Sequence, residues 1–135
     1  MSKKIQFGGE VLRAMELENG GLSLVTGSDY IVKNVSIGTG VAESGELDCG
    51  EGSRLVGYTI DGALVTTAIT YKVGHTAGTR QALYYNSAAV SDTVAASKNV
   101  SVDPGIFYPW RYVSFVAGTV QGGTACVIGA VLASL

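Results

Sequence analysis

Short runs in which apolar and polar residues alternate cover most of the chain, and glycine-rich segments separate them. The clearest runs are residues 30–37 and 112–117; in the second, Val113, Phe115 and Ala117 share one side. A period of two is typical of a β-strand with one buried face, whereas a helix repeats every 3.6 residues. The pattern therefore predicts strands rather than helices along most of the sequence.

Eight short strands are expected on this basis, and no strand–helix–strand alternation is present. Asp61-Gly62 predicts a tight hairpin between two of the strands, and the polar segment 120–124 predicts a second hairpin near the end of the chain. Many short strands joined by glycine-rich turns are typical of an all-β protein, here an antiparallel two-sheet sandwich of the jelly-roll or immunoglobulin-like type. The expected strands are residues 22–25, 30–37, 55–60, 63–73, 81–85, 94–102, 112–117 and 125–132.

The first 21 residues are expected to form an N-terminal arm, and residues 22–135 the sandwich domain. Residues 10–18 contain good helix formers and are followed by Asn19-Gly20-Gly21, which would end a helix of about two turns. An extended arm or a first strand fits the same residues equally well, because they show no clear apolar face. Lys3, Lys4 and Arg13 give the arm positive charge, and such arms often become ordered only when bound to a neighbour.

Composition indicates a protein whose surface is partly covered in an assembly. The 135 residues are enough for one domain with its own core, and 47% of them are apolar. Only 15% are charged, well below the roughly 25% of a typical soluble domain. The formal net charge of −2 provides no basic field for nucleic-acid binding, so no nucleic-acid partner is expected.

Neither end of the sequence predicts export or membrane insertion. The first ten residues lack the apolar core of a signal peptide, so synthesis in the cytoplasm is expected. Residues 112–135 carry no charge and contain a GxxxG spacing, which raises the alternative of a transmembrane helix. Residues 121–124 (QGGT) interrupt this run and β-branched residues flank them, which favours two strands around a turn and no membrane partner.

The two cysteines, Cys49 and Cys126, fit neither a CxxC metal pair nor a disulfide-rich framework. Buried free thiols are the expected state, and one long-range disulfide is the alternative.

No residue pattern predicts catalysis, and the protein is not expected to be an enzyme. His75 is the single histidine, so a catalytic triad or an imidazole metal site would have to include it, yet an exposed loop histidine is the simpler interpretation. The acidic segment 38–52 could offer oxygen ligands to calcium but matches no EF-hand spacing; a solvated loop is favoured. Glycoside hydrolysis would need two paired carboxylates, and the acidic residues here lack the apolar setting that would raise the pKa of one of them. No phosphate-binding glycine motif occurs. No cofactor or metal is therefore expected.

Aromatic residues gather between residues 107 and 112. Tyr108, Trp110 and Arg111 belong to the residue types that dominate binding hot spots, and Tyr112 follows them. Packing of this group at a corner of the core is the competing interpretation.

The second half of the chain resembles a group of small tailed-bacteriophage virion proteins. The likeness covers roughly residues 55–135 and rests on four short motifs: residues 68–74 (AITYKVG), 81–85 (QALYY), 100–104 (VSVDP) and 111–119 (RYVSFVAGT). The resemblance implies a β-sandwich that decorates or cements the capsid, located in the virion on the capsid surface. Its implied partners are the major capsid protein and copies of itself in a homo-oligomer.

The residues expected to contact these partners lie in the arm and in the aromatic segment. A carbohydrate-binding or adaptor module of a phage tail or baseplate is the alternative function, with Tyr108, Trp110 and Tyr112 as stacking platforms for a glycan. The expected interface residues are Lys3, Lys4, Phe7, Arg13, Tyr108, Trp110 and Arg111.

Overall fold

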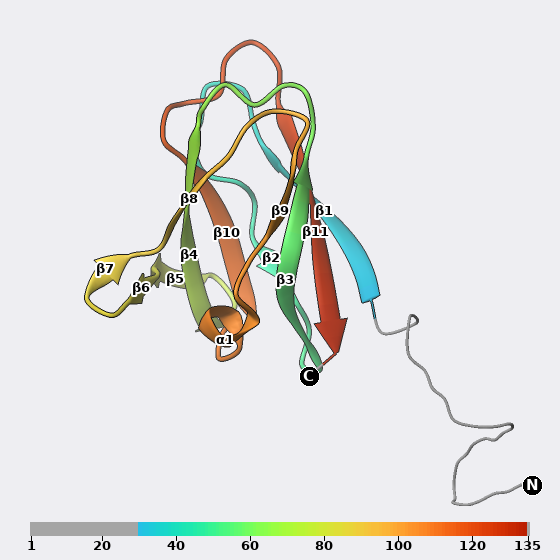
Figure 1. Cartoon of the computed structure of the whole chain (residues 1–135), viewed down its shortest axis with the longest axis vertical. Helices are drawn as coiled ribbons and strands as arrows, with labels where there is room; N and C mark the ends of the chain where they lie inside the picture. Colours follow the sequence, from blue (N-terminus) through green and yellow to red (C-terminus); the bar gives the residue numbers. More distant parts are fainter. Residues whose placement is uncertain (1–29, 135) are drawn as a thin grey trace, which may run out of the picture. The chain divides into compact units, whose positions relative to one another are not determined.

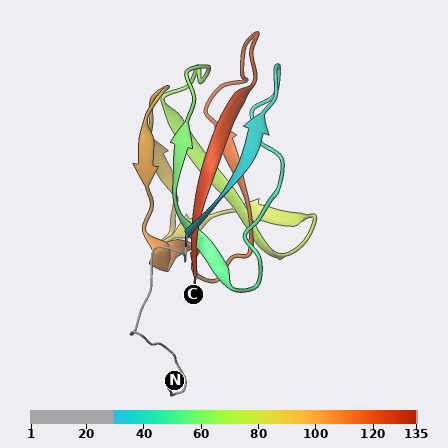
Figure 2. The ribbon, with the colours of Figure 1, turned by 90° about the vertical axis from the view of Figure 1, so that its right-hand side faces the viewer.

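Two antiparallel β-sheets face each other across a shared apolar core in the computed structural model, which describes residues 30–134 (Figures 1 and 2). The all-β sandwich expected from the alternating pattern is confirmed. Its elements are β1 (Tyr30–Ile37), β2 (Leu47–Asp48), β3 (Ser53–Ile60), β4 (Ala68–Thr76), β5 (Thr79–Ala82), β6 (Tyr84–Tyr85), β7 (Ala88–Ala89), β8 (Ser91–Thr93), β9 (Asn99–Ser101), α1 (Pro104–Phe107), β10 (Tyr112–Ala117) and β11 (Cys126–Ser134).

The larger sheets contain strands that are distant in sequence. One sheet has the order β1-β11-β3-β9, so the last strand lies between the first and the third. The other has the order β2-β10-β4-β5, and β8 also pairs with β4. β6 and β7 form a separate small hairpin beside them. Each of the two larger sheets is therefore held together by hydrogen bonds between strands that are distant in sequence.

Aromatic rings from both sheets occupy the centre of the core. Tyr58 of β3 contacts Phe115 of β10 edge to face, with ring centroids 4.8 Å apart, and Tyr71 of β4 lies 5.0 Å from Phe107 of α1. The alternation predicted for β10 is confirmed, because Val113, Phe115 and Ala117 are all buried. Such offset and T-shaped contacts favour one defined packing of the rings.

The two hairpins predicted from sequence are wrong. β3 and β4 lie in different sheets, and so do β10 and β11. Asp61 explains the first case: one carboxylate oxygen accepts a hydrogen bond from the N–H of Ala63 at 2.9 Å, and the other accepts one from the N–H of Val127 at 2.9 Å. The Asp-Gly turn thus joins the end of β3 to the start of β11 and sends the chain to the opposite sheet, where β4 begins only at Ala68.

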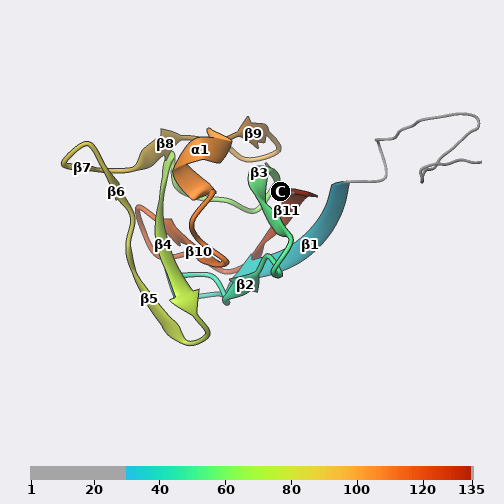
Figure 3. The same cartoon turned by 90° about the horizontal axis from the view of Figure 1, so that it is seen from below.

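Two other predicted strands are shorter than expected. The run 81–85 breaks at Leu83, whose N–H donates to the carbonyl of Tyr71 and whose own carbonyl accepts from Val90. The run 94–102 contains only the three residues of β9. α1 follows, capped by Asp103, whose carboxylate accepts from the N–H of Gly105 at 2.9 Å. This short helix lies across the lower end of the sandwich (Figure 3).

Several predictions concern residues outside the described part of the chain. They are the arm over residues 1–21, its boundary with the domain, the strand at 22–25, and the interface residues Lys3, Lys4, Phe7 and Arg13. Within residues 30–134, no helix is long and apolar enough to span a membrane.

Candidate interaction surfaces

The aromatic segment predicted as an interface is divided by α1 into buried and exposed residues. Phe107 is buried in the core, whereas the side chain of the next residue, Tyr108, is 62% exposed. The N–H of Trp110 donates to the carbonyl of Phe107 at 3.0 Å, which fixes the chain just after the helix and leaves the indole half-buried. Core packing therefore applies to Phe107, whereas the interface role of Tyr108 and Trp110 stays a prediction.

Arg111 is bound within the domain. Its guanidinium donates to both carboxylate oxygens of Asp48, at 2.8 and 3.2 Å, and lies 5.1 Å from the centre of the Tyr112 ring. Hydrogen bonding from Arg111, with help from the N–H of Gly50, lowers the pKa of Asp48 to about 2. A charge that is already paired contributes less to a new contact, so Arg111 is a weaker interface candidate than its neighbours.

The acidic segment is not the solvated loop expected from its sequence. Leu47 and Cys49 are buried, and β2 pairs with β10. Arg80 forms ion pairs with Glu43 and Glu46, and Lys72 donates to Glu43 at 2.9 Å. Burial alone would raise the pKa of Glu43, but hydrogen bonds from its neighbours outweigh it and lower the pKa overall.

Glu43 and Glu46 thus bind side chains of β4 and β5, while Asp48 binds Arg111. In the described part of the chain, no group of three or more His, Cys, Asp or Glu residues is placed to hold a metal ion.

Gln121 forms hydrogen bonds that connect three loops at the upper end of the sandwich. We call residues 38–42, 62–67 and 118–125 the apical loops (Figure 1). The backbone of Gln121 exchanges hydrogen bonds of 2.8 Å with Gly40 and Val41, and its buried amide group donates to the carbonyls of Ala63 and Thr124. The backbone of Gln121 therefore joins residues 38–42 to residues 118–125, and its side chain joins residues 62–67 to the same loop.

The apical loops present aliphatic side chains to solvent and contain no charged residue. Val120 is 61% exposed, Val65 is 56% exposed and Val41 is 47% exposed. A rigid, uncharged surface with several exposed valines has the character of a protein contact site, because a free surface usually carries charge. The sequence predicts residues 63–67 as part of the strand 63–73, residues 38–42 as part of the acidic loop and residues 120–124 as a turn, so it does not bring them together. Their common Gly, Thr and Val composition without charge is the available signal.

β1 provides a second exposed apolar surface. Within residues 30–134 it is the outermost strand of its sheet, with β11 as its neighbour, and its last residues are connected to the following loop by a bridge between Ile37 and Ser44. Ile31 and Val32, in its first half, are 45% and 64% exposed. An exposed edge with apolar side chains is a template for pairing with another strand.

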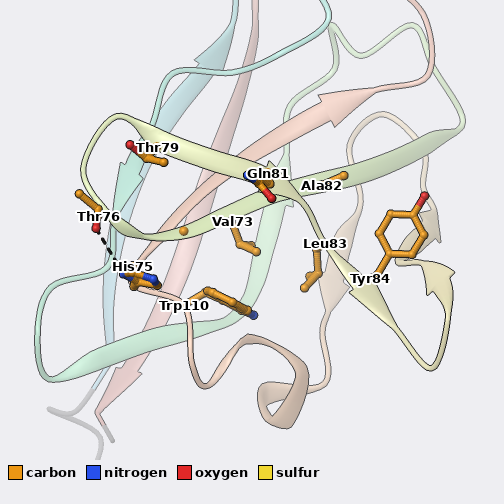
Figure 4. A pocket seen from close by; sticks show the side chains of 10 residues that line it. Val73, His75, Thr76, Thr79, Gln81, Ala82, Leu83, Tyr84 and Trp110 are labelled. Atoms are coloured by element: carbon orange, nitrogen blue, oxygen red, sulfur yellow. Dashed lines mark hydrogen bonds between the residues drawn. The ribbon is translucent and has the colours of Figure 1, made fainter.

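A pocket of about 320 Å³ lies between the β4–β5 hairpin and the segment after α1 (Figure 4). We call it the hairpin pocket. His75, which sequence reasoning placed in a loop, lies near the end of β4 and lines this pocket with an exposed side chain. Its ring nitrogen Nδ1 lies 3.2 Å from the hydroxyl of Thr76. The pocket residues are Val73, Gly74, His75, Thr76, Thr79, Gln81, Ala82, Leu83, Tyr84 and Trp110.

Both cysteines are buried free thiols, as expected from their spacing. Burial raises the pKa of Cys49 and of Cys126 to about 11. Since the thiolate is the reactive form, these residues are core side chains rather than reactive groups at neutral pH.

No family model matches the chain. No curated protein and no solved structure matches it either. Its function is therefore inferred from the surfaces described above.

Proposed function

We propose that this protein is a structural component of a tailed-phage virion that binds the outer surface of the head and stabilises contacts between major capsid subunits. The resemblance of residues 55–135 to small virion proteins supports this proposal, and so does the low charge content of the chain, 15%. The protein acts by binding, as a rigid sandwich displayed in many copies.

The single observation that carries the proposal is the apical surface. Val41, Val65 and Val120 stand exposed on loops that Gln121 holds in place, so docking them requires little ordering of the chain. Burying the exposed part of each valine contributes about 1 kcal/mol from apolar area alone. Many copies bound to one shell can stabilise it even if each copy binds with modest affinity, because each contact adds to the stability of the same particle.

The edge strand β1 supports a bridging role. Its first half lies at the opposite end of the sandwich from the apical loops (Figure 1). In that half, Val32 and Asn34 lie over Gly129 of β11: a Cβ added to Gly129 would be 3.6 Å from a methyl group of Val32 and 3.3 Å from the amide oxygen of Asn34. Ile31 points to the other face by the alternation of the strand. A sandwich with one contact surface at each end can join two capsid subunits, or a capsid subunit and a second copy of itself.

Sedimentation with phage heads assembled without this protein tests the proposal. The purified protein is mixed with such heads, and the bound fraction is measured in the pellet. The double variant Val65→Asp/Val120→Asp should bind at least tenfold more weakly, because docking would bury two unpaired carboxylates. Ala88→Asp, on the exposed β6–β7 hairpin, is the matched control and should bind as the unchanged protein does.

The predicted arm is tested in the same assay. Deletion of residues 2–21 should leave a folded β domain by circular dichroism and should weaken sedimentation with heads. Absence of the unchanged protein from the pellet at every concentration would overturn head binding itself. Full binding by the Val65→Asp/Val120→Asp variant would overturn the assignment of the apical loops.

A further inference from the structure

The hairpin pocket has a lining that head attachment by the apical loops does not use. The register pairs Val73 of β4 with Gln81 of β5, so the two side chains lie on the same face of the hairpin. Val73 and Leu83 are buried and form the apolar floor, while Trp110 and Tyr84 lie on two sides of it (Figure 4). The pocket is therefore an open site with aromatic walls at the edge of the five-stranded sheet.

The aromatic walls are held by the fold before any ligand arrives. Trp110 lies between two anchored positions: Phe107, buried against Tyr71, and Arg111, paired with Asp48. A hydrogen bond from its N–H to the carbonyl of Phe107 fixes the backbone of Trp110, and the partly buried indole packs against the core. A side chain held in this way loses little freedom when it binds a ligand, and preorganisation of this kind favours affinity.

Tyr84 is positioned from the opposite side by the β6–β7 hairpin. Its residue pair in that hairpin is Ala89, and the turn uses Asn86 and Ser87 with positive φ angles of 52° and 68°. The preceding residue, Leu83, is bonded to both Tyr71 and Val90, which ties the start of the hairpin to the core. Tyr84 itself is 63% exposed, so its ring is available to a ligand.

The polar side chains of the hairpin pocket carry hydroxyl, amide, imidazole and indole groups. No Asp, Glu, Lys or Arg lines it. Within the described part of the chain, the side chains of Gln81, Tyr84 and Trp110 make no hydrogen bond to another residue, so each keeps its capacity for a ligand. Apolar and aromatic walls with a few such groups are typical of small-molecule sites, and about 320 Å³ is at the lower end of their roughly 300–1,000 Å³ range.

From this combination we infer that the hairpin pocket binds a neutral saccharide, such as one hexose unit at the end of a glycan. A pyranose has an apolar face of C–H groups that stacks on an aromatic ring, and its hydroxyls both donate and accept hydrogen bonds. Trp110 and Tyr84 supply the stacking faces, while Gln81, Thr79 and His75 supply partners for the hydroxyls. An anionic sugar gains no cationic partner from Lys or Arg here, so the pocket selects for neutral ligands.

This site differs from the glycan platform expected from sequence, which combined Trp110 with Tyr108 and Tyr112. Neither of those tyrosines lines the hairpin pocket; Tyr108 is exposed outside it, and the ring of Tyr112 is covered by Arg111. Tyr84 takes their place. The inference is also independent of head binding, because it uses no residue of the apical loops or of β1.

Binding is measured by NMR titration of the ¹⁵N-labelled full chain with the methyl glycosides of glucose, galactose, mannose and N-acetylglucosamine, together with an array of neutral and acidic oligosaccharides. At least one neutral glycoside should shift amide signals of β5, β6 and residues 108–111 and leave those of the apical loops unchanged. Tyr84→Ala should weaken this binding about tenfold, the effect of one lost aromatic contact. Tyr85→Ala is the matched control, since Tyr85 is a similarly exposed neighbour that does not line the pocket, and should bind normally.

The same measurements can overturn the inference. No saturable shift from any neutral glycoside at about 10 mM would show that the pocket is not a saccharide site. An equal loss of affinity in Tyr84→Ala and Tyr85→Ala would also overturn the inference. So would binding confined to acidic oligosaccharides or to an aromatic peptide. Both tyrosines are exposed on a small peripheral hairpin, so their variants should keep the fold, and unchanged thermal melting checks this.

Discussion

The hydroxyl group of Tyr71 links two other polar groups next to the aromatic core. It lies 2.7 Å from the hydroxyl of Tyr58 and donates to a carboxylate oxygen of Asp92 at 2.5 Å. Because Tyr71 uses its single hydroxyl hydrogen in the bond to Asp92, Tyr58 is the donor in the bond between the two tyrosines. Burial raises the pKa of Tyr58 and of Tyr71 far above neutrality, so both hydroxyls keep their protons in the folded protein.

Replacement of Tyr71 by Phe should therefore cost more than one ordinary hydrogen bond. It removes a bond to a charged acceptor, worth roughly 1.5–3 kcal/mol, and it leaves the buried hydroxyl of Tyr58 without an acceptor. We expect a loss of about 3 kcal/mol in the free energy of unfolding. Tyr58→Phe removes one hydrogen bond but leaves the hydroxyl of Tyr71 bonded to Asp92, so a loss of about 1 kcal/mol in the free energy of unfolding is expected.

The double variant distinguishes this chain of hydrogen bonds from two independent effects. In Tyr58→Phe/Tyr71→Phe no stranded hydroxyl remains, so the combined loss should be smaller than the sum of the single losses by about 1 kcal/mol. Urea denaturation followed by circular dichroism gives the free energies, and the dependence on urea should have the same slope in all variants. A loss below about 1 kcal/mol for Tyr71→Phe, or strict additivity in the double variant, would refute the proposed chain.

Three further predictions concern the sheet edge, an ion pair and the thiols. Gly74→Ala should destabilise the fold by roughly 1–3 kcal/mol, because a Cβ there would lie 2.0 Å from a carbonyl oxygen of β5. The pKa of Asp48 is lowered from 3.8 to about 2, so its bond to Arg111 stabilises the fold above about pH 4 and this contribution is lost as the pH falls to about 2. The variant Asp48→Asn should therefore lose less stability than the unchanged protein over this pH range. The effect should stay below about 1 kcal/mol because the pair is partly exposed and solvent weakens it. Cys49 and Cys126 should react with iodoacetamide at pH 8 only after unfolding, as followed by mass spectrometry.

A control variant is available for the first of these predictions, and a contradicting result can be named for each of the other two. Gly78→Ala leaves the space around the new Cβ open and tests only the positive φ of its turn, so it should destabilise the fold less than Gly74→Ala does. Equal acid sensitivity of the unchanged protein and Asp48→Asn would contradict a stabilising role for the pair with Arg111. Rapid alkylation of either cysteine in the native protein would contradict its burial.

Alternation of side chains along single strands was predictable from sequence, whereas the partners of those strands were not. The bounds of the runs at 30–37 and 112–117 match those of β1 and β10, and in β10 the alternating apolar residues are buried because side-chain direction in a strand depends on local spacing. In β1 the first five residues are all exposed, so its alternation is not matched by burial. The Asp-Gly turn at residue 61 also reads as a local signal, yet its outcome is set by a hydrogen bond from Val127, 66 residues away. No pattern near Asp61 contains that information.

The candidate sites were predictable to a similar, partial extent. Tyr108 and Trp110 have the same aromatic character in the sequence, but the end of α1 places only Trp110 in the hairpin pocket. Tyr84 comes to that pocket from a separate hairpin, and Gln121 gathers the apical loops from three parts of the chain. Both arrangements depend on contacts between distant segments, so neither could be found from residue types alone.

The position of β11 has a consequence for the order of folding during synthesis. This strand lies between β1 and β3, and neither of these is paired with the other. The ribosome must therefore have made residues 126–134 before the four-stranded sheet can close. Until then β1 and the outer edge of β3 lack their common partner and expose strand edges to other chains. A C-terminal truncation that removes β11 would leave two separated edges in place of one sheet, and the nascent protein would rely on fast completion or on chaperones to avoid aggregation.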